Sequence, residues 1–459
     1  MIIFNTLDQI LENLNNKKYS NYIINDGLES ISFFDFFSRV KENISSIKVS
    51  SKRFFIKANN DIFFIESLFS IIFSGNIAIP INPEFTKEKI DFLKEKFNID
   101  YIIYDSFPKI NENNNDFKIS SETPALAIFT SGTTGEAKAV LMSHKNILFN
   151  AYSVIKTMNI SNPENIGIIL PLYHSFALIT QLITSFITGA NIYLLPKTNN
   201  YKDFSDFIIK NKINTMAGVP TNFKMLLFGE NKEYPNVKHI TIAGASLDKK
   251  LAEKIHKSFF NSEIWVGYGL TEAGPRVTAI NYNDPKFHNG SVGKSINGVE
   301  IIVKDNDILI NSKSNMICYL DDKDSTDKKI IDSYLYSGDT GYIDEDGYLY
   351  ITGRKDDIFI SSGEKISPLI IEKVLNYHPN IVNSAIFGEY DDILGKRIIA
   401  VVKLKDESII KAKDLLLHCS NLLEKHQIPH KFFKTNELPM TPNGKIMRRE
   451  LPKCQKEKI

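Results

Sequence analysis

Short apolar runs alternate with amphipathic segments along the first third of the chain, and this alternation constrains the fold more than any other feature. The apolar runs have the length and composition of buried strands: FFIKA (54–58), AIPI (78–81), YIIYD (101–105), ALAIFTS (125–131) and IGIIL (166–170). Lys87–Lys96 and His144–Met158 instead carry apolar residues with helical spacing. Alternating strands and helices predict an α/β fold with parallel sheets.

The character of the sequence changes near residue 340. YIDEDGYLYITG (342–353) predicts a hairpin with Asp346-Gly347 in its turn, and GRKDD (353–357) then forms a polar break. Ser367-Pro368 predicts a helix N-cap followed by proline in the first turn. We also expect strands at 383–390 and 398–405 and a helix at 412–425. A chain of 459 residues exceeds one ordinary domain. We therefore predict a large multi-sheet α/β domain (1–352) and a small α+β domain (353–459).

Charge and cysteine content exclude several function classes. The 55 basic and 54 acidic residues leave a net charge of +1, which argues against nucleic-acid binding by bulk electrostatics. Cys318, Cys419 and Cys454 lie far apart without a CxxC, so we predict neither a zinc site nor a disulfide framework. With no secretory signal at the start of the sequence, we expect a reducing, cytoplasmic location.

One uncharged stretch raises the question of a membrane span. Residues 166–196 contain no Asp, Glu, Lys or Arg, and that length would suffice to cross a bilayer. Pro171, His174, Gln181 and Gly189 interrupt the stretch, however. We interpret it as buried core and expect no transmembrane segment.

The loop TSGTTGEAK (130–138) has the composition of a phosphate-binding loop. It follows an apolar strand and precedes an amphipathic helix. Glycines allow the backbone to approach a ligand and present its N–H groups, and Thr, Ser and Lys138 add further donors. The spacing is not that of the P-loop, GxxxxGK[ST]. A flexible surface loop is the alternative interpretation.

A second glycine cluster, GYGLTEAG (267–274), does not match the dinucleotide fingerprint because Glu272 replaces the third glycine. It supplies instead an aromatic ring for a purine in Tyr268, a hydroxyl for phosphate in Thr271 and a carboxylate for Mg²⁺ in Glu272. A plain strand-to-loop turn is the alternative.

Two further clusters lie toward the C-terminus. SGDTG (337–341) holds Asp339, which could accept the hydroxyls of a ribose or simply form an Asx-turn. TPNGK (441–445) predicts a turn that carries Lys445 on its tip, where a charged residue is most often solvated. Neither GxSxG nor HExxH occurs, so the motifs of serine and zinc hydrolases are absent.

Taken in order, these clusters resemble the motifs of the adenylate-forming superfamily, which includes acyl-CoA and acyl-carrier-protein synthetases. The resemblance rests on TSGTTGEAK, GASL (244–247), GYGLTE, YSGDTG, GRKDD with SSGEKISP, and TPNGK, and it covers about Ser51 to Leu451. It implies a large N-terminal region and a small mobile C-terminal domain. It also implies a two-step reaction, in which ATP and a carboxylate give an acyl-adenylate that a thiol then attacks.

The resemblance also implies roles for individual residues. The ATP phosphates would be bound by the first loop, through Thr130, Ser131, Gly132, Thr133, Thr134, Gly135 and Lys138. Adenine and the α-phosphate would be bound by Gly244, Ala245, Ser246, Tyr268 and Thr271. Glu272 would hold Mg²⁺, and Asp339 and Arg354 would bind the ribose. Asp356 matches the hinge, Lys445 would act in adenylation, and Gly363 would line the channel for the phosphopantetheine arm of coenzyme A or a carrier protein.

The sequence departs from the family pattern at three positions. Ala137 and Ala139 flank the loop lysine where the family usually has proline and glycine, which puts the rigidity of the loop in doubt. Ser362 stands where many CoA ligases have glycine, which makes the thiol channel less certain.

PLYHSFALI (171–179) bears on the choice of acid. Amino-acid-adenylating relatives typically place an aspartate near this segment, whereas this chain has His174 and Ser175 and no carboxylate. We therefore hypothesise a fatty, small acyl or aryl acid, with His174 gating or lining its pocket or serving only as a core residue. Val219-Pro220-Thr221 and Gly267 are expected to line the same pocket.

Arg276 is unusual in its position after EAGP. It predicts either a structural ion pair, which we favour, or a contact with a second anionic group of the substrate or with a carrier.

Two functions compete with an acyl- or aryl-acid:thiol ligase. One is an amino-acid adenylating ligase that loads a carrier protein, and the other is a nucleotide-binding regulatory protein without catalysis. Coenzyme A and a carrier protein present the same arm, so the motifs do not separate them as acceptors.

Overall fold

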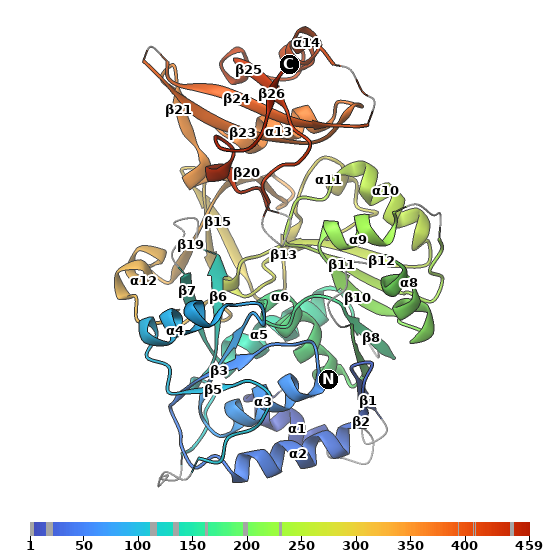
Figure 1. Cartoon of the computed structure of the whole chain (residues 1–459), viewed down its shortest axis with the longest axis vertical. Coiled ribbons are helices and arrows are strands. Elements are labelled where there is room, and N and C mark those ends of the chain that lie inside the picture. The colour runs from blue at the N-terminus through green and yellow to red at the C-terminus, as the bar shows by residue number, and fades with distance from the viewer. Residues whose placement is uncertain are drawn as a thin grey trace. The chain divides into compact units, whose positions relative to one another are not determined.

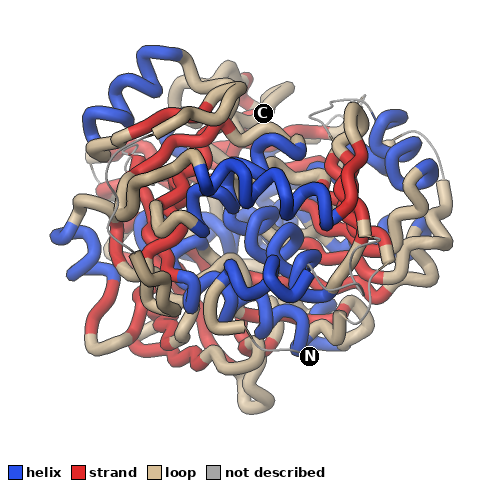
Figure 2. The backbone as a smooth tube through the Cα atoms, turned by 90° about the horizontal axis from the view of Figure 1, so that it is seen from below, coloured by secondary structure: helices blue, strands red, loops and turns tan. Residues whose placement is uncertain are grey.

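The computed structural model describes residues 4–14, 22–110, 117–131, 137–160, 164–195, 201–228, 232–392, 394–406, 408, 410–440 and 445–459 (Figure 1). The chain divides into two compact units, Met1–Ile302 with Leu309–Ser337 and Val303–Ile308 with Gly338–Ile459. Helices and strands interleave (Figure 2), so the predicted α/β class is confirmed. The predicted domain boundary after Thr352 falls inside the second unit and stays a prediction.

The first unit contains a nine-stranded sheet in the order β14-β13-β12-β11-β10-β8-β9-β1-β2. Its central strands are parallel, whereas β2, β13 and β14 add antiparallel ends. The strand bounds are β1 Ile23–Asn25, β2 Ser30–Ser32, β8 Asn165–Ile168, β9 Asn191–Leu194, β10 Thr215–Gly218, β11 His239–Ile242, β12 Glu263–Tyr268, β13 Thr278–Asn281 and β14 Lys294–Ser295.

A six-stranded sheet in the order β17-β7-β6-β4-β3-β5 also lies in the first unit. Its strands are β3 Arg53–Lys57, β4 Ile77–Ile81, β5 Tyr101–Ile103, β6 Pro124–Ser131, β7 Ala137–Ser143 and β17 Cys318–Tyr319. The strands predicted at 54–58, 78–81, 101–105 and 125–131 are confirmed, as is their parallel pairing. One expectation was wrong, because strand β7 separates the phosphate-type loop from the helix that follows it.

Helices cover the strands of the first unit. Figure 1 shows α8, α9 and α10 beside β10, β11 and β12. Side chains of Ser143, Asp61 and Asp248 cap α5, α3 and α10 by accepting backbone N–H bonds. The bounds are α1 Leu7–Leu14, α2 Phe33–Ser45, α3 Ile62–Phe73, α4 Lys87–Lys96, α5 His144–Thr157, α6 Ser175–Ala177, α7 Thr184–Thr188, α8 Tyr201–Lys210, α9 Pro220–Leu226, α10 Lys249–Ser258, α11 Pro285–His288 and α12 Lys323–Lys329.

The uncharged stretch after Asn165 is confirmed as core. It forms β8, α6, a π-helix at Leu178–Ile183, α7 and β9, and every residue of the π-helix is buried. Within the described ranges, no helix has both the length and the apolar character needed to cross a membrane.

His144 makes the stability of the first unit depend on pH. Its Nδ1 accepts a hydrogen bond from the Leu7 N–H at 3.0 Å, and burial lowers its pKa from 6.5 to about 4. Between pH 6.5 and about 4, His144 therefore binds a proton in the unfolded chain but not in the folded chain, so acid favours unfolding. We expect the free energy of unfolding to fall by up to roughly 3 kcal/mol as the pH drops from 6.5 to 4.

Denaturant titrations across this pH range measure the effect. His144→Gln keeps an acceptor for the Leu7 N–H and cannot take up a proton, so its stability should depend less steeply on pH. Equal slopes for the variant and the parent would show that His144 is not the group responsible.

The division between the units runs through a five-stranded sheet. Its members are β15 Glu300–Lys304, β16 Asp307–Asn311, β18 Ile330–Ile331, β19 Tyr334–Ile343 and β20 Leu349–Arg354. Strands β19 and β20 pair antiparallel around the turn that contains Asp346 and Gly347, which confirms the predicted hairpin. Gly347 has a φ of 82°, a conformation that glycine adopts without strain.

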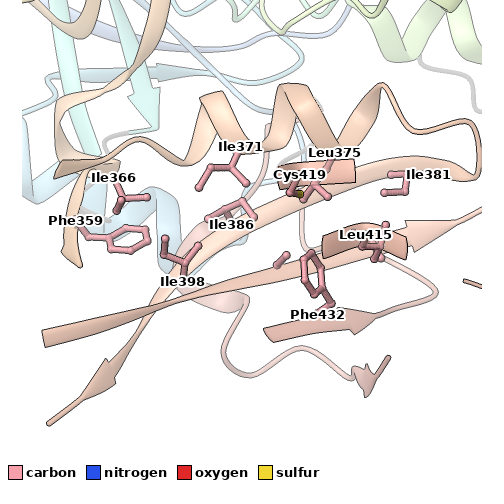
Figure 3. Close-up of a cluster of buried hydrophobic side chains, with 12 residues drawn as sticks. Phe359, Ile366, Ile371, Leu375, Ile381, Ile386, Ile398, Leu415, Cys419 and Phe432 are labelled. Carbon is pink, nitrogen blue, oxygen red and sulfur yellow. The ribbon is translucent and has the colours of Figure 1, made fainter. Parts of the chain in front are cut away.

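The second unit also holds a two-stranded and a four-stranded sheet. Its elements are β21 Phe359–Ser361, β22 Glu364–Ile366, β23 Ile381–Asp391, β24 Gly395–Leu404, β25 Lys431–Lys434, β26 Glu457–Lys458, α13 Pro368–Asn376, α14 Ala412–Ser420 and 3-10 turns at Lys355–Asp357, Lys425–Gln427 and Arg448–Glu450. Figure 3 shows Ile371 and Leu375 of α13 facing Ile386 and Ile398 of the sheet. The predicted strands and the Ser367-Pro368 helix start are confirmed, but α14 ends at Ser420, earlier than expected.

Candidate active site

Three of the predicted motifs follow neighbouring parallel strands and therefore meet at one edge of the large sheet. Gly218 at the end of β10 pairs with Ile242 at the end of β11, and Ile242 pairs with Val266 near the end of β12. The segments that begin at Val219, Gly244 and Tyr268 consequently emerge side by side. In parallel α/β sheets, ligands bind outside the carboxyl ends of the strands.

The histidine segment reaches the same edge. Ile168 of β8 pairs with Ala217 of β10, and the chain then continues into 171–175. His174 is the N-cap residue of α6 and makes no side-chain cap bond, and its ring lies 4.4 Å from that of Tyr173, centroid to centroid. The pocket role proposed for His174 stays a prediction.

Gly244 must be a glycine for local reasons. Its φ is +87°, and a Cβ there would lie 3.1 Å from Val219 Cγ1. Of the next two residues, Ala245 is half-buried and Ser246 is exposed. This bend follows β11, which pairs with β12, the strand that ends at Tyr268. The adenine role of these residues stays a prediction.

Thr271 and Glu272 lie in a 3-10 turn, Thr271–Ala273, whose backbone accepts hydrogen bonds from residues outside the turn. The Met316 N–H donates to the Glu272 carbonyl at 2.7 Å, and Ser314 Oγ donates to the Ala273 carbonyl at 2.7 Å. The Thr271 hydroxyl lies 2.9 Å from that of Ser175. These bonds orient the two predicted site residues before any ligand binds.

Glu272 and Lys138 are linked through a residue that carries no sequence signal. Tyr319 donates its hydroxyl to Glu272 Oε1 at 2.8 Å, and Lys138 Nζ lies 4.9 Å from the centroid of the Tyr319 ring. Lys138 also donates to Ser325 Oγ at 2.7 Å and lies 3.9 Å from Asp322 Oδ2. Tyr319 and Ser325 were missed because only the fold brings them to this place.

The donor set fits a magnesium ion that arrives with a nucleotide. Among the residues that the structure describes, no three His, Cys, Asp or Glu side chains cluster to hold a metal. Mg²⁺ is usually bound by one or two carboxylates together with substrate phosphates and water, rather than by an all-protein cage. Glu272 alone satisfies that requirement.

The phosphate-type loop joins β6 to β7. Thr130 pairs with Lys138 across this hairpin, so the first and last members of the motif lie side by side. Gly132, Thr133, Thr134 and Gly135 lie outside the described residues, as does the side chain of Ser131. The phosphate role of the loop stays a prediction.

In the second unit, Asp339 and Arg354 form a pair across β19 and β20. They are register partners, and Arg354 Nη1 lies 3.3 Å from Asp339 Oδ1. The Asp339 side chain is 9% exposed and that of Arg354 is 41% exposed. The pair holds the carboxylate in place, which suits an acceptor of two ribose hydroxyls.

Gly363 and Lys445 both belong to the second unit. Ser362 (φ 51°) and Gly363 (φ 84°) form the two-residue connection of β21 and β22, and positive φ at both positions is typical of a type I′ turn. Lys445 is exposed at the end of 441–444, which lie outside the described residues. Met440 and Ile446, on either side of this stretch, form an isolated antiparallel β-bridge.

The structural ion pair that we favoured for Arg276 is not found, because no acidic side chain among the described residues pairs with it. The residue is fully buried, and its Nε, Nη1 and Nη2 have no hydrogen-bond acceptor in the described part of the chain. Its guanidinium carbon lies 5.0 Å from the centroid of the Phe176 ring. Burial lowers the pKa of Arg276 to about 9, so the group still carries its charge at neutral pH.

Gly267 provides the space that Arg276 occupies. A Cβ on Gly267 would lie 1.9 Å from Arg276 Nη1 and 2.7 Å from the Thr278 carbonyl oxygen. Gly267→Ala should therefore lower the free energy of unfolding by about 1–3 kcal/mol, as overpacking does. Denaturant titration measures this, with Gly218→Ala as the control because its Cβ would meet nothing closer than 3.0 Å. Equal stability of the two variants would contradict the predicted clash.

Comparison with known proteins identifies the family of enzymes that the chain resembles. The model of the AMP-binding enzyme family matches residues 111–312, and the model of the AMP-binding enzyme C-terminal domain matches residues 370–445. The chain is 28% identical to an oxalate–CoA ligase of Saccharomyces cerevisiae over 79% of this chain and 72% of that protein. It is 26% identical to a 2-succinylbenzoate–CoA ligase of Bacillus subtilis over 86% of this chain and 81% of that protein.

Solved structures share the fold. The chain superposes on the o-succinylbenzoate CoA synthetase of Bacillus subtilis in complex with its acyl-adenylate intermediate with a TM-score of 0.85. The sequence identity is 23%, and the match covers 98% of this chain and 99% of that one.

Proposed function

The chain belongs to the AMP-binding enzymes of the adenylate-forming superfamily, and on this premise we propose that it activates a carboxylic acid with ATP and transfers the acyl group to a thiol. In the first half-reaction a carboxylate oxygen attacks the α-phosphorus, the bond to pyrophosphate breaks, and an acyl-adenylate forms. In the second, the sulfur of a deprotonated thiol attacks the acyl carbon and AMP leaves. AMP is the better leaving group, because a bare carboxylate would have to expel an oxide.

The observation that carries this proposal is the register of β10, β11 and β12. It brings the Gly244, Tyr268 and Thr271 segments to one edge of the sheet. Thr271, oriented by Ser175, donates to the α-phosphate, while Tyr268 stacks on adenine. The 130–138 loop and Lys138 bind the β- and γ-phosphates, where negative charge accumulates.

Glu272 is the proposed protein ligand of magnesium, held in place by Tyr319. When bound, Mg²⁺ neutralises charge on the phosphate oxygens and so stabilises the transition state. Asp339 accepts the ribose hydroxyls and Arg354 orients that carboxylate. Lys445 donates to the carboxylate and α-phosphate oxygens during adenylation, and Gly363 borders the phosphopantetheine arm in the second half-reaction.

The acid is expected to lack an α-amino group. No Asp or Glu occurs in 171–179, whereas the cation Arg276 lies at the same edge of the sheet. A buried cation disfavours a substrate ammonium nearby, because like charges repel strongly where water is excluded. The acceptor is coenzyme A, as in the ligases named above, with the phosphopantetheine of a carrier protein as the alternative.

Carboxylate-dependent pyrophosphate release tests the proposal. The protein is incubated with ATP, Mg²⁺ and one acid at a time from a panel of fatty, aryl, dicarboxylic and amino acids, and pyrophosphate is measured. A response to an acid without an amino group is expected. A response to amino acids alone would favour the carrier-loading alternative, and ATP binding without pyrophosphate release from any acid would favour a regulatory role.

A further inference from the structure

Arg276 presents a charge that the described protein does not neutralise. All three of its guanidinium nitrogens are buried, and within the described ranges none has a hydrogen-bond acceptor. Buried charges in proteins are otherwise paired or bind a ligand, because an uncompensated buried charge is costly. An anion bound at this place would compensate the charge, and the described part of the chain does not supply one.

The surroundings of Arg276 belong to the candidate active site. Its side chain fills the space beside Gly267 on β12, one residue before Tyr268, and its guanidinium lies against Phe176, one residue after Ser175. Ser175 in turn contacts Thr271, the proposed donor to the α-phosphate. Arg276 thus lies beside the segments that carry Tyr268 and Ser175, which would surround the acid.

The geometry of the guanidinium favours a carboxylate as its partner. The Phe176 ring covers the guanidinium at 5.0 Å, which leaves the in-plane N–H groups as the donors that lack acceptors. A carboxylate accepts two such N–H groups in one plane, in a bidentate pair. Burial shields this pair from water and strengthens it.

We propose that Arg276 binds a second carboxylate of the substrate, so that the activated acid is a dicarboxylic acid. One carboxylate is adenylated near Thr271 and the other is held by Arg276. This inference rests on the proposed function, and it names the substrate class of that same site.

The test compares each dicarboxylic acid with its own monomethyl ester, which has nearly the same shape and one carboxylate fewer. Diacids with two to six carbons and an aryl diacid form the panel, and pyrophosphate release gives kcat/KM. We expect at least one diacid to exceed its monoester by about 10²-fold. Arg276→Met should reduce that ratio to near one, while Arg276→Lys should retain part of it. Arg39→Met removes a half-buried arginine of α2 that pairs with Glu29 and Glu66, and it should leave the ratio unchanged.

Activity on monocarboxylic acids without preference for any diacid would overturn the inference and leave the proposed function intact. So would an Arg276→Met protein that keeps the full preference. If both Arg276 variants fail to fold, the diacid-to-monoester ratio of the parent protein is the test. A ratio well above one supports the inference, and a ratio near one for every diacid overturns it.

Calorimetric titration of the same diacids and monoesters is the second measurement, used if no acid releases pyrophosphate. Diacid binding that Arg276→Met abolishes supports the inference while the proposed activity fails. Absence of diacid binding overturns the inference.

Discussion

Lys445→Ala is expected to lower the rate of acyl-adenylate formation by about 10²- to 10³-fold while sparing the second half-reaction. The proposed role of the ammonium is to neutralise charge that develops between the carboxylate and the α-phosphate. That charge is absent once the adenylate has formed. Pyrophosphate exchange into ATP measures the first half-reaction, and thioester formation from supplied acyl-adenylate measures the second.

Lys453→Ala is the matched control, because Lys453 is a 76% exposed lysine of the same C-terminal segment. It should leave both half-reactions unchanged. If Lys445→Ala slows both half-reactions equally, Lys445 does not act specifically in adenylation, and the role assigned to it is wrong.

Local elements could be predicted from the sequence, since their signals lie within a few residues. Helix α4 has the predicted bounds Lys87–Lys96, and the hairpin around Gly347 follows from its turn sequence. Strand β7 was not predicted, because AKAVLMS directly precedes a helix and does not alternate between polar and apolar residues. Pairing with β6 on one side and β17 on the other makes it a strand.

The candidate site was only partly predictable for the same reason. Thr271 and Glu272 stand in a recognisable motif, but Tyr319 reaches Glu272 from 47 positions away and its neighbours form no motif. For Arg276 the sequence suggested an ion pair. Only the fold reveals that the side chain is buried beside Gly267 without an acidic partner in the described residues. Contacts between distant segments carry this information, and a single sequence does not contain it.

The segment that carries Lys445 is fixed to the rest of the second unit by a largely buried ionic cluster around Arg448. Arg448 Nη2 donates to Glu372 Oε2 at 2.9 Å and Nε donates to Asp357 Oδ2 at 2.9 Å, while Nη1 contacts Glu372 Oε1. The Ile386 N–H also donates to Glu372 at 2.7 Å. Burial alone would lower the pKa of Arg448, but the hydrogen bonds and charges of the two carboxylates raise it above its usual range.

Removing Arg448 would leave Glu372 buried without its counter-charge. The Glu372 side chain is 5% exposed and its pKa is already raised by burial, against the opposing effect of Arg448. Arg448→Ala should therefore lower the free energy of unfolding of the second unit by about 3–5 kcal/mol. Hydrogen exchange of the α13 and β23 amides, together with denaturant titration, measures the change.

The neighbouring residue supplies the control, because Arg449 is exposed and Arg449→Ala removes the same charge next to the cluster. It should cost well under about 1 kcal/mol, as surface substitutions usually do. The double variant Arg448→Met/Glu372→Leu replaces both buried charges with apolar groups and should recover much of the lost stability. If Arg448→Ala and Arg449→Ala are equally mild, the cluster does not anchor the segment. A stable Arg448→Ala protein that has lost adenylation would instead mean that Arg448 acts on the position of Lys445 without holding the unit together.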